Sequence, residues 1–185
     1  MKDGRTADTV AGLPVAIGLG ANLGNPRAAI RQAVGLLVQR GLRGLRASGL
    51  YESEPVDCVA GTPVFLNAAL TGIWAGGAEA LLILCQAIER QLGRPAAHSS
   101  REARVIDVDI LLFGGSVVQQ PRLIVPHPRL RDRLFVLLPL AEIAGDWLVP
   151  PGNETVARLC QRLAAQPELS GTVRWVAPGP GSAQA

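Results

Sequence analysis

The chain has 185 residues, 48% of them apolar, and a formal net charge of +3, which fits one domain with a single core. No apolar run is long enough to span a bilayer, and the first ten residues lack the apolar stretch of a secretory signal. Three widely spaced cysteines without a CxxC pair argue against a disulfide framework and a zinc site. We therefore expect a cytoplasmic protein with no membrane partner, in which Cys85 and Cys160 are core residues.

The hydrophobic pattern and the turn residues predict strands and helices in alternation. After a flexible leader at 1–12 and a first strand, Asn25 and Pro26 mark the start of the first helix and Gly41 marks its end. The expected strands are 13–20, 45–53, 64–74 and 104–113, and the expected helices are 25–41, 77–93, short helices within 129–143, and 154–166.

This β-α-β-β-α-β order predicts an α+β fold of the ferredoxin-like type. We expect the helices to cover one face of an antiparallel sheet and to leave the other face for loops and a substrate cleft. The domain is expected to cover 13–166. A C-terminal extension follows at 167–185, and its last residues, from 177 on, are expected to be disordered.

Within the first strand–helix turn, the stretch "GLGANLG" has the position of a dinucleotide-binding glycine loop. Its spacing is GxGxxxG, and no acidic residue follows about twenty residues later to hold a ribose, so the turn itself explains the glycines. RNA-binding modules share the predicted fold but display aromatic residues on the sheet, and aromatic residues make up only 4% of this chain. We therefore expect no nucleic-acid partner.

Two aspartates, Asp107 and Asp109, interrupt a strand that is otherwise apolar. Side chains alternate between the faces of a strand, so both carboxylates point the same way, about 6 to 7 Å apart. Like charges at this distance call for a positive partner, which can be arginine, lysine or Mg²⁺. The alternative is the solvated face of an edge strand, and the spacing alone leaves both interpretations open.

Arginines cluster around this strand. Between residues 86 and 134 there are eight arginines and five acidic residues, so this window carries the whole positive excess. Guanidinium groups match phosphate geometry, although a bias in codon usage also favours arginine over lysine. His127 lies between two prolines and near Arg122, Arg129, Arg131 and Arg133, which places it to donate a hydrogen bond to an anion. The alternative is a structural histidine.

Asn67 is the polar member of the apolar stretch "FLNAAL". Its amide offers donors and an acceptor, which complement the edge of a pterin or a purine. The alternative is a hydrogen bond to an adjacent loop, and Asn67 alone does not decide between the two.

Six stretches, taken together and in order, resemble the 6-hydroxymethyl-7,8-dihydropterin pyrophosphokinase family. Its members move a pyrophosphoryl group from ATP to a pterin alcohol and release AMP. The similarity runs from about Val15 to about Leu163. It rests on "AIGLGANLG", "YESEP", "FLNAA", "IERQLGR", "RVIDVDILLFG" and "VPHPRLRDRLFVLLPLAEIA".

The resemblance implies a site for each substrate, and we expect the protein to be a monomer. Asp107 and Asp109 would hold two Mg²⁺ ions that bridge the phosphates of the co-substrate ATP, and Arg94 and Arg104 would be the catalytic arginines. The implied ATP-binding residues are Gln86, Glu89, Ile110, Arg122, His127 and Arg133. The implied pterin-binding residues are Gly20, Ser53, Val56, Phe65, Asn67 and Phe135.

The chain departs from the family pattern in the loop 93–103, which is expected to close over the substrates, and beside it. Glu102 and Ala103 replace Gly-Pro, Arg101 replaces a frequent aromatic residue, Ala96 a frequent arginine and Val105 a frequent threonine. Altered lid residues can slow turnover and leave binding intact. A pterin- or nucleotide-binding paralogue with weak or altered catalysis is therefore the alternative function, and the pterin itself could serve folate or a related one-carbon cofactor.

Overall fold

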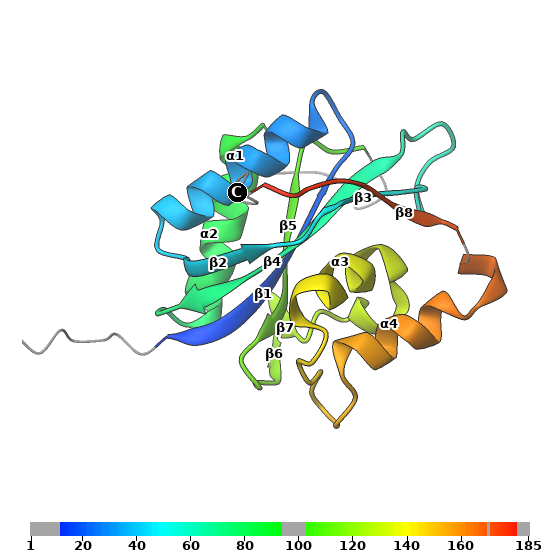
Figure 1. The fold of residues 1–185 in the computed structure, drawn as a ribbon. Coiled ribbons are helices and arrows are strands. Elements are labelled where there is room, and N and C mark those ends of the chain that lie inside the picture. The colour runs from blue at the N-terminus through cyan, green and yellow to red at the C-terminus, as the bar shows by residue number, and fades with distance from the viewer. Residues whose placement is uncertain (1–11, 94–102, 170, 181–185) are drawn as a thin grey trace, which may run out of the picture.

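A computed structural model of the protein describes residues 12–93, 103–169 and 171–180, and its strands and helices are labelled in Figure 1. The strands are β1 (Leu13–Ala21), β2 (Arg43–Ala47), β3 (Leu50–Ser53), β4 (Phe65–Trp74), β5 (Asp107–Phe113), β6 (Val118–Gln120), β7 (Leu123–Val125) and β8 (Val173–Ala177). The helices are α1 (Pro26–Gln39), α2 (Ala78–Gln91), α3 (Leu134–Ala144) and α4 (Val156–Ala164), with 3₁₀ turns at Leu130–Asp132 and Pro167–Leu169.

The main sheet is antiparallel, with the strand order β5-β1-β4-β3-β8, and β2 also pairs with β4. The elements follow one another along the chain in the predicted order, with β2 and β3 together in the place of one predicted strand: β1, α1, β2 and β3, β4, α2 and β5. The prediction of a ferredoxin-like α+β fold is therefore confirmed. Local signals explain α1: the side chain of Asn25 accepts a hydrogen bond from the Ala28 amide at 3.0 Å, and Pro26 occupies the first turn.

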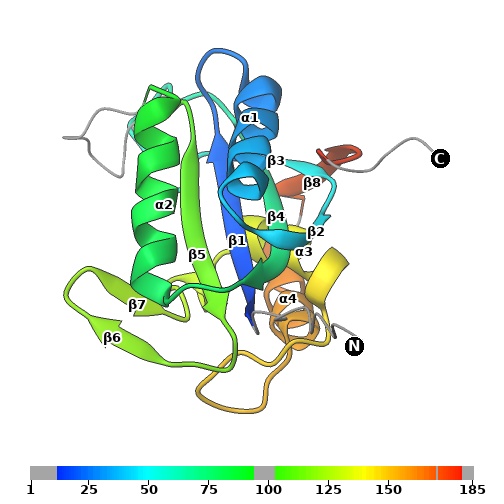
Figure 2. The same ribbon diagram turned by 90° about the vertical axis from the view of Figure 1, so that its left-hand side faces the viewer.

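Helices cover both faces of the sheet (Figures 1 and 2). One core lies between the sheet and the α1–α2 pair, and a second core lies between the opposite face and the α3–α4 pair. The prediction that only one face carries helices was therefore wrong. α3 is apolar almost all round, "LFVLLPLAEIA", so it can bury one side against the sheet and another against α4. The cleft is confined to the part of this face that α3 leaves open.

The predicted strand at 45–53 is broken into β2 and β3 at Ser48 and Gly49. Ser48 is fully buried, and its hydroxyl accepts a hydrogen bond from the Ala69 amide at 2.9 Å. The Gly49 amide instead donates to the carboxylate of Glu142 on α3, at 2.9 and 3.1 Å. The break is therefore stabilised by a residue 93 positions away along the chain.

Three strands were missed by the sequence analysis. β6 and β7 form a hairpin of their own, and β8 pairs with β3 at one end of the main sheet. β8 lies within the segment 167–185 that was expected to follow the domain, and residue 177 is part of this strand. The expected leader, except for residue 12, and the last residues, 181–185, lie outside the described residues.

Cys85 and Cys160 are buried on α2 and α4, which confirms them as core residues. Burial raises the pKa of the Cys85 thiol, so this thiol stays protonated near neutral pH. Among the described residues, no helix combines the length and the apolar character needed to cross a membrane.

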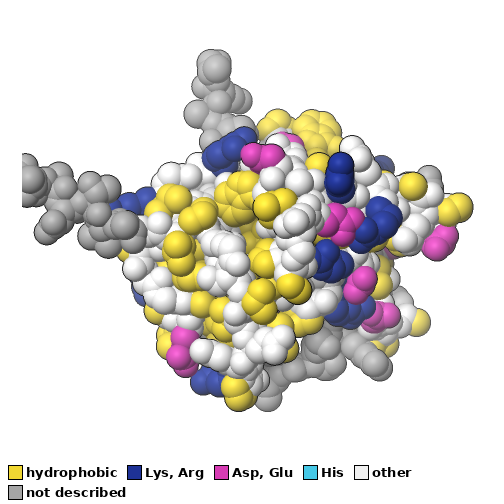
Figure 3. Space-filling view, turned by 90° about the horizontal axis from the view of Figure 1, so that it is seen from below, with side chains coloured by type: hydrophobic (Ala, Val, Ile, Leu, Met, Phe, Trp, Pro, Cys, Tyr) yellow, Lys and Arg dark blue, Asp and Glu magenta, His cyan; other side chains and the backbone are white. Residues whose placement is uncertain are grey.

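Hydrophobic side chains occupy much of the face seen from below, and charged side chains gather toward one side of that view (Figure 3). Exposed apolar residues are spread over several elements, for example Val38 on α1, Ile83 on α2 and Ile124 on β7. Exposed apolar residues scattered in this way are normal on a protein surface, and we assign them no binding role.

Candidate active site

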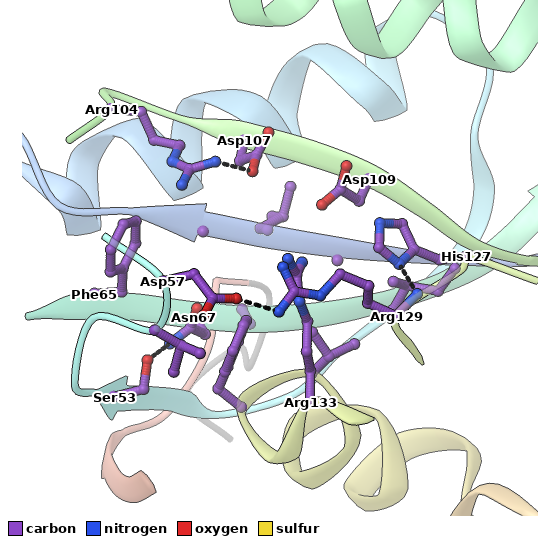
Figure 4. A pocket seen from close by; sticks show the side chains of 18 of the residues that line it. Ser53, Asp57, Phe65, Asn67, Arg104, Asp107, Asp109, His127, Arg129 and Arg133 are labelled. Atoms are coloured by element: carbon purple, nitrogen blue, oxygen red, sulfur yellow. Dashed lines mark hydrogen bonds and ion pairs between the residues drawn. The ribbon is translucent and has the colours of Figure 1, made fainter. Parts of the chain in front are cut away.

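A cavity of about 510 Å³ opens on the sheet face that also carries α3. Its walls come from β1, β3, β4 and β5, from the loop after β3, and from the segment between β7 and α3 (Figure 4). Most of the predicted site residues meet there. They are Gly20, Ser53, Val56, Phe65, Asn67, Arg104, Asp107, Asp109, His127, Arg133 and Phe135.

Strand register brings the key polar groups to one level of the sheet. Gly20 on β1 pairs with Asp107 on one side and with Asn67 on the other. Directly paired residues of antiparallel strands share a face, so all three line the same surface. A Cβ at Gly20 would lie 3.5 Å from Oδ1 of Asn67, so a side chain there would enter the space between the carboxylate and the amide.

The paired aspartates are both partly buried and point into the cavity (Figure 4). Nη1 of Arg104 donates to Oδ2 of Asp107 at 2.7 Å, and the guanidinium lies 5.2 Å from the centre of the Phe65 ring. Arginine is therefore one positive partner of the pair, as the sequence suggested. Carboxylate oxygens on one face of one strand also form the hard donor set that Mg²⁺ prefers, so the residues fit this ion.

His127 lies next to β5 on the side of Asp109, and its backbone amide donates to the Leu111 carbonyl at 3.0 Å (Figure 4). Its Nδ1 accepts a hydrogen bond from the Arg129 amide at 3.1 Å, which places the ring proton on Nε2. Burial and the nearby guanidinium groups of Arg133 and Arg129 lower the pKa of His127 to about 4, although Asp107 opposes this shift. His127 is therefore a neutral hydrogen-bond donor near neutral pH.

The arginines around His127 have different roles. Arg133 lines the cavity, and its Nε is buried without a hydrogen-bond partner among the described residues. Burial, and then the positive charge of Arg129, lower the pKa of Arg133. An orphaned guanidinium nitrogen is costly, so an anion in the cavity would stabilise it. Arg131 points elsewhere, because its Nη2 donates to the Val149 carbonyl at 2.7 Å.

The amide of Asn67 is oriented by β3. Its Nδ2 donates to the hydroxyl of Ser53 at 2.9 Å and to the Tyr51 carbonyl at 3.3 Å. Oδ1 lies on the side of Gly20 and of the cavity. Phe65 and Phe135 add apolar surface to the same cavity. This end of the cavity therefore presents an oriented amide beside aromatic rings.

The structure places the other four predicted ATP-binding residues outside the cavity. Ile110 is buried on the opposite face of β5, and Glu89 on α2 accepts a hydrogen bond from the Val108 amide at 2.8 Å. Gln86 and Arg122 contact each other at 3.5 Å. β5 ends the strand order, so residues on its two faces meet only around its outer edge. Arg94, Ala96, Arg101 and Glu102 lie outside the described residues.

Sequence reasoning missed Asn22, in the stretch analysed only for its glycines. Asn22 is buried, accepts a hydrogen bond from the Arg104 amide at 2.7 Å, and donates to the Pro63 carbonyl at 3.0 Å. The amides of Asn22 and Leu23 both donate to the Arg104 carbonyl, at 3.0 and 3.2 Å. Asn22 thus fixes the backbone from which Arg104 reaches Asp107. A polar residue directly after a buried strand was the available signal.

Asp57 and Arg129 also line the cavity and were not predicted as site residues. They form an ion pair between the loop after β3 and the segment after β7 (Figure 4). Arg129 was noted only as part of the arginine cluster, and the sequence contains no signal that pairs it with Asp57.

The family model described as 7,8-dihydro-6-hydroxymethylpterin-pyrophosphokinase (HPPK) matches residues 16–145. A pyrophosphokinase of Bacillus subtilis, named for 2-amino-4-hydroxy-6-hydroxymethyldihydropteridine, is 42% identical over 69% of this chain and 75% of its own length. The equally named protein of Methylorubrum extorquens is 38% identical over 80% of this chain and 91% of its own length.

Longer proteins match as well. A mitochondrial folate synthesis bifunctional protein of Arabidopsis thaliana is 40% identical over 77% of this chain, but the chain spans only 25% of that relative. The wild-type crystal structure of Plasmodium falciparum HPPK-DHPS shares the fold with a TM-score of 0.64 at 14% identity, over 89% of this chain and 48% of that one. The match of the family model and of full-length relatives is decisive: the chain belongs to the 7,8-dihydro-6-hydroxymethylpterin-pyrophosphokinase family.

Proposed function

We propose that the protein transfers a pyrophosphoryl group from ATP to 6-hydroxymethyl-7,8-dihydropterin in folate biosynthesis, giving the pterin diphosphate and AMP. One observation carries this proposal: a pair of carboxylates, a buried unsatisfied guanidinium and an oriented amide with two aromatic rings line a single cavity. The guanidinium, and Mg²⁺ held by the carboxylates, suit a polyphosphate. The amide with the two aromatic rings suits a flat heterocycle with hydrogen-bonding edges.

The reaction joins the hydroxymethyl oxygen of the pterin to the β-phosphorus of ATP. The bond between the β-phosphorus and the oxygen that bridges to the α-phosphate breaks, AMP leaves with that oxygen, and the hydroxyl proton passes to solvent. Phosphoryl-type transfer of this kind needs little covalent chemistry from a protein. It requires in-line positioning and stabilisation of negative charge.

Asp107 and Asp109 are the residues that would hold Mg²⁺, as two ions by family resemblance. Bound there, the metal would supply charge neutralisation to the phosphate oxygens. Arg104 stays close to these carboxylates through its ion pair with Asp107. Arg133 and Nε2 of His127 line the same cavity and can donate to phosphate there.

The pterin is proposed to lie at the Asn67 end of the cavity. Oδ1 of Asn67 would accept from the pterin edge, with Ser53 and Val56 beside it and Phe65 and Phe135 around the ring. The adenosine would extend around the outer edge of β5 toward the four predicted residues that lie outside the cavity, and Arg94 is proposed to join the site. These residues are Gln86, Glu89, Ile110 and Arg122.

A product assay tests the proposal directly. The purified protein is incubated with ATP, Mg²⁺ and 6-hydroxymethyl-7,8-dihydropterin, and the products are separated by chromatography. We expect equal amounts of AMP and pterin diphosphate, loss of activity with a chelator, and recovery with added Mg²⁺. ADP as the only nucleotide product would contradict the proposal.

The departures in and beside the lid loop favour a second candidate, a pterin- or nucleotide-binding paralogue with weak or altered catalysis. Val105, for example, stands in the structure just before β5, where a threonine is frequent. Calorimetry separates the candidates, because tight pterin binding without product would support the paralogue. We also propose a monomeric, cytoplasmic protein, which light scattering and cell fractionation can check.

A further inference from the structure

The ion pair between Asp57 and Arg129 joins two segments that lie far apart in the sequence. Asp57 belongs to the loop between β3 and β4, and Arg129 to the segment between β7 and α3. Both side chains line the cavity and both are about half exposed, at 56% and 46%. The pair therefore lies where the cavity meets solvent, and Figure 4 shows the two side chains reaching toward each other.

Arg129 lines the cavity together with His127 and Arg133. Burial is the main cause of the lowered pKa of His127 and of Arg133, and the positive charge of Arg129 lowers both further, so Arg129 lies close to the two. His127 and Arg133 are the groups proposed to bind phosphate, and Arg129 lies beside them and carries the same guanidinium group as Arg133. Its guanidinium is nevertheless engaged by a carboxylate of the protein itself.

The backbone of Asp57 has a φ of +58°, in the left-handed region. Residues other than glycine rarely adopt this backbone conformation, and Asp and Asn tolerate it best among them. Replacement by Asn or Gly is therefore compatible with the backbone: Asn keeps the shape of the side chain and removes its charge, and Gly removes the side chain. The role of the carboxylate can therefore be tested without backbone strain at this position.

We propose that Arg129 is a further phosphate-binding residue and that Asp57 competes with the phosphates for it. In the free protein the carboxylate occupies the guanidinium, and a polyphosphate, which carries more charge, displaces it. The inference rests on the proposed function, because it takes the cavity to be the polyphosphate site. An exposed ion pair is weak, so the competition changes affinity by a few-fold only.

Calorimetry with α,β-methylene-ATP and Mg²⁺ measures this competition, because the analogue keeps the triphosphate and cannot release AMP. Asp57→Asn and Asp57→Gly should each lower Kd about threefold at low ionic strength, and the gain should shrink at about 500 mM salt. Arg129→Gln should raise Kd about tenfold. In the Arg129→Gln background, Asp57→Asn should bring no further gain.

Glu52→Gln is the matched control. Glu52 pairs with Arg174 on the β3–β8 side and does not line the cavity, so its loss should leave Kd unchanged. Circular dichroism verifies that each variant is folded. An unchanged or higher Kd in Asp57→Asn overturns the inference. The inference is also overturned if Asp57→Asn lowers Kd by the same factor in the wild type and in the Arg129→Gln background, because the effect would then be a general one of charge.

Inorganic tripolyphosphate, titrated in parallel, separates this inference from the proposed function. If the protein binds tripolyphosphate and not the nucleotide analogue, the proposed function fails, and the same set of variants still tests the competition. If neither probe binds, the inference is overturned.

Discussion

At the scale of single residues, the carboxylates of Asp107 and Asp109 are the groups on which the proposed reaction depends most. Asp107→Asn and Asp109→Asn keep the shape and remove the charge that would hold Mg²⁺. We expect each to lower kcat by about 10³-fold or more with little change in fold. Steady-state assays and thermal unfolding measure the two effects. Glu79→Gln, at an exposed acid on α2, is the control, and full activity in both aspartate variants would refute the metal assignment.

His127 predicts a specific dependence of stability on pH. Its pKa is lowered to about 4 in the folded protein, whereas an unfolded chain has the ordinary value of about 6.5. Between these values the unfolded chain binds more protons, so the folded state loses stability as the pH falls through this range and loses no more below it. With allowance for its partial exposure, we expect this contribution to be about 1–2 kcal/mol.

Urea unfolding of the wild type and of His127→Asn near pH 7 and near pH 4 isolates this contribution. Asn can still accept the hydrogen bond from the Arg129 amide, and it does not titrate. The wild type should lose about 1–2 kcal/mol more than the variant on acidification. Equal losses would show that the imidazole keeps an ordinary pKa.

Asn22 shows why the direction of a side chain is harder to predict than its identity. The position is visible in the sequence, but its role depends on Arg104 and Pro63, which lie 82 and 41 positions away. The arginine cluster also shows that residue identity does not give side-chain direction. Arg133 faces the cavity and Arg131 faces the Val149 carbonyl, although both belong to one short segment.

At the scale of elements, Asn22 ties the loop after β1 to the approach to β5. Asn22→Ala should lower kcat through a displaced Arg104 and should lower the free energy of unfolding by about 1–3 kcal/mol. Asn22→Asp keeps the acceptor for the Arg104 amide and should recover part of kcat. Enzyme assays and urea unfolding measure both.

Asn25→Ala is the control in the same loop. It removes the cap of α1 and should cost about 1 kcal/mol of stability without lowering kcat. If both alanine variants lower kcat in proportion to stability, Asn22 has no positioning role.

The elements that the sequence predicted correctly are those with local signals. The cap at Asn25 and the apolar periodicity of α2 lie within the helices themselves. β2 and β3 were merged, because the break at Gly49 depends on Glu142 from α3. β8 was missed because "VRWVA" is short and half exposed and becomes a strand only by pairing with β3.

At the scale of the whole molecule, β8 completes one end of the sheet. A chain that ends at Leu169 would expose the backbone edge of β3, and we expect a loss of about 2 kcal/mol or more, about 4–8 °C in Tm, with a tendency to aggregate. Thermal unfolding and light scattering measure these effects. A chain that ends at residue 180 is the control, and equal stability of the two would show that β8 contributes nothing.

The sequence by itself determined the β-α-β-β-α-β order of the core, the same-face placement of Asp107 and Asp109, and the family, because each of these depends on local periodicity or on ordered motifs. Only the tertiary structure decided that α3 and α4 cover the second face, that Asn22 positions Arg104, and that Asp57 pairs with Arg129. Those features join residues that are distant along the chain. No local pattern in the sequence specifies which of these residues meet in space, because the packing of the whole molecule brings them together.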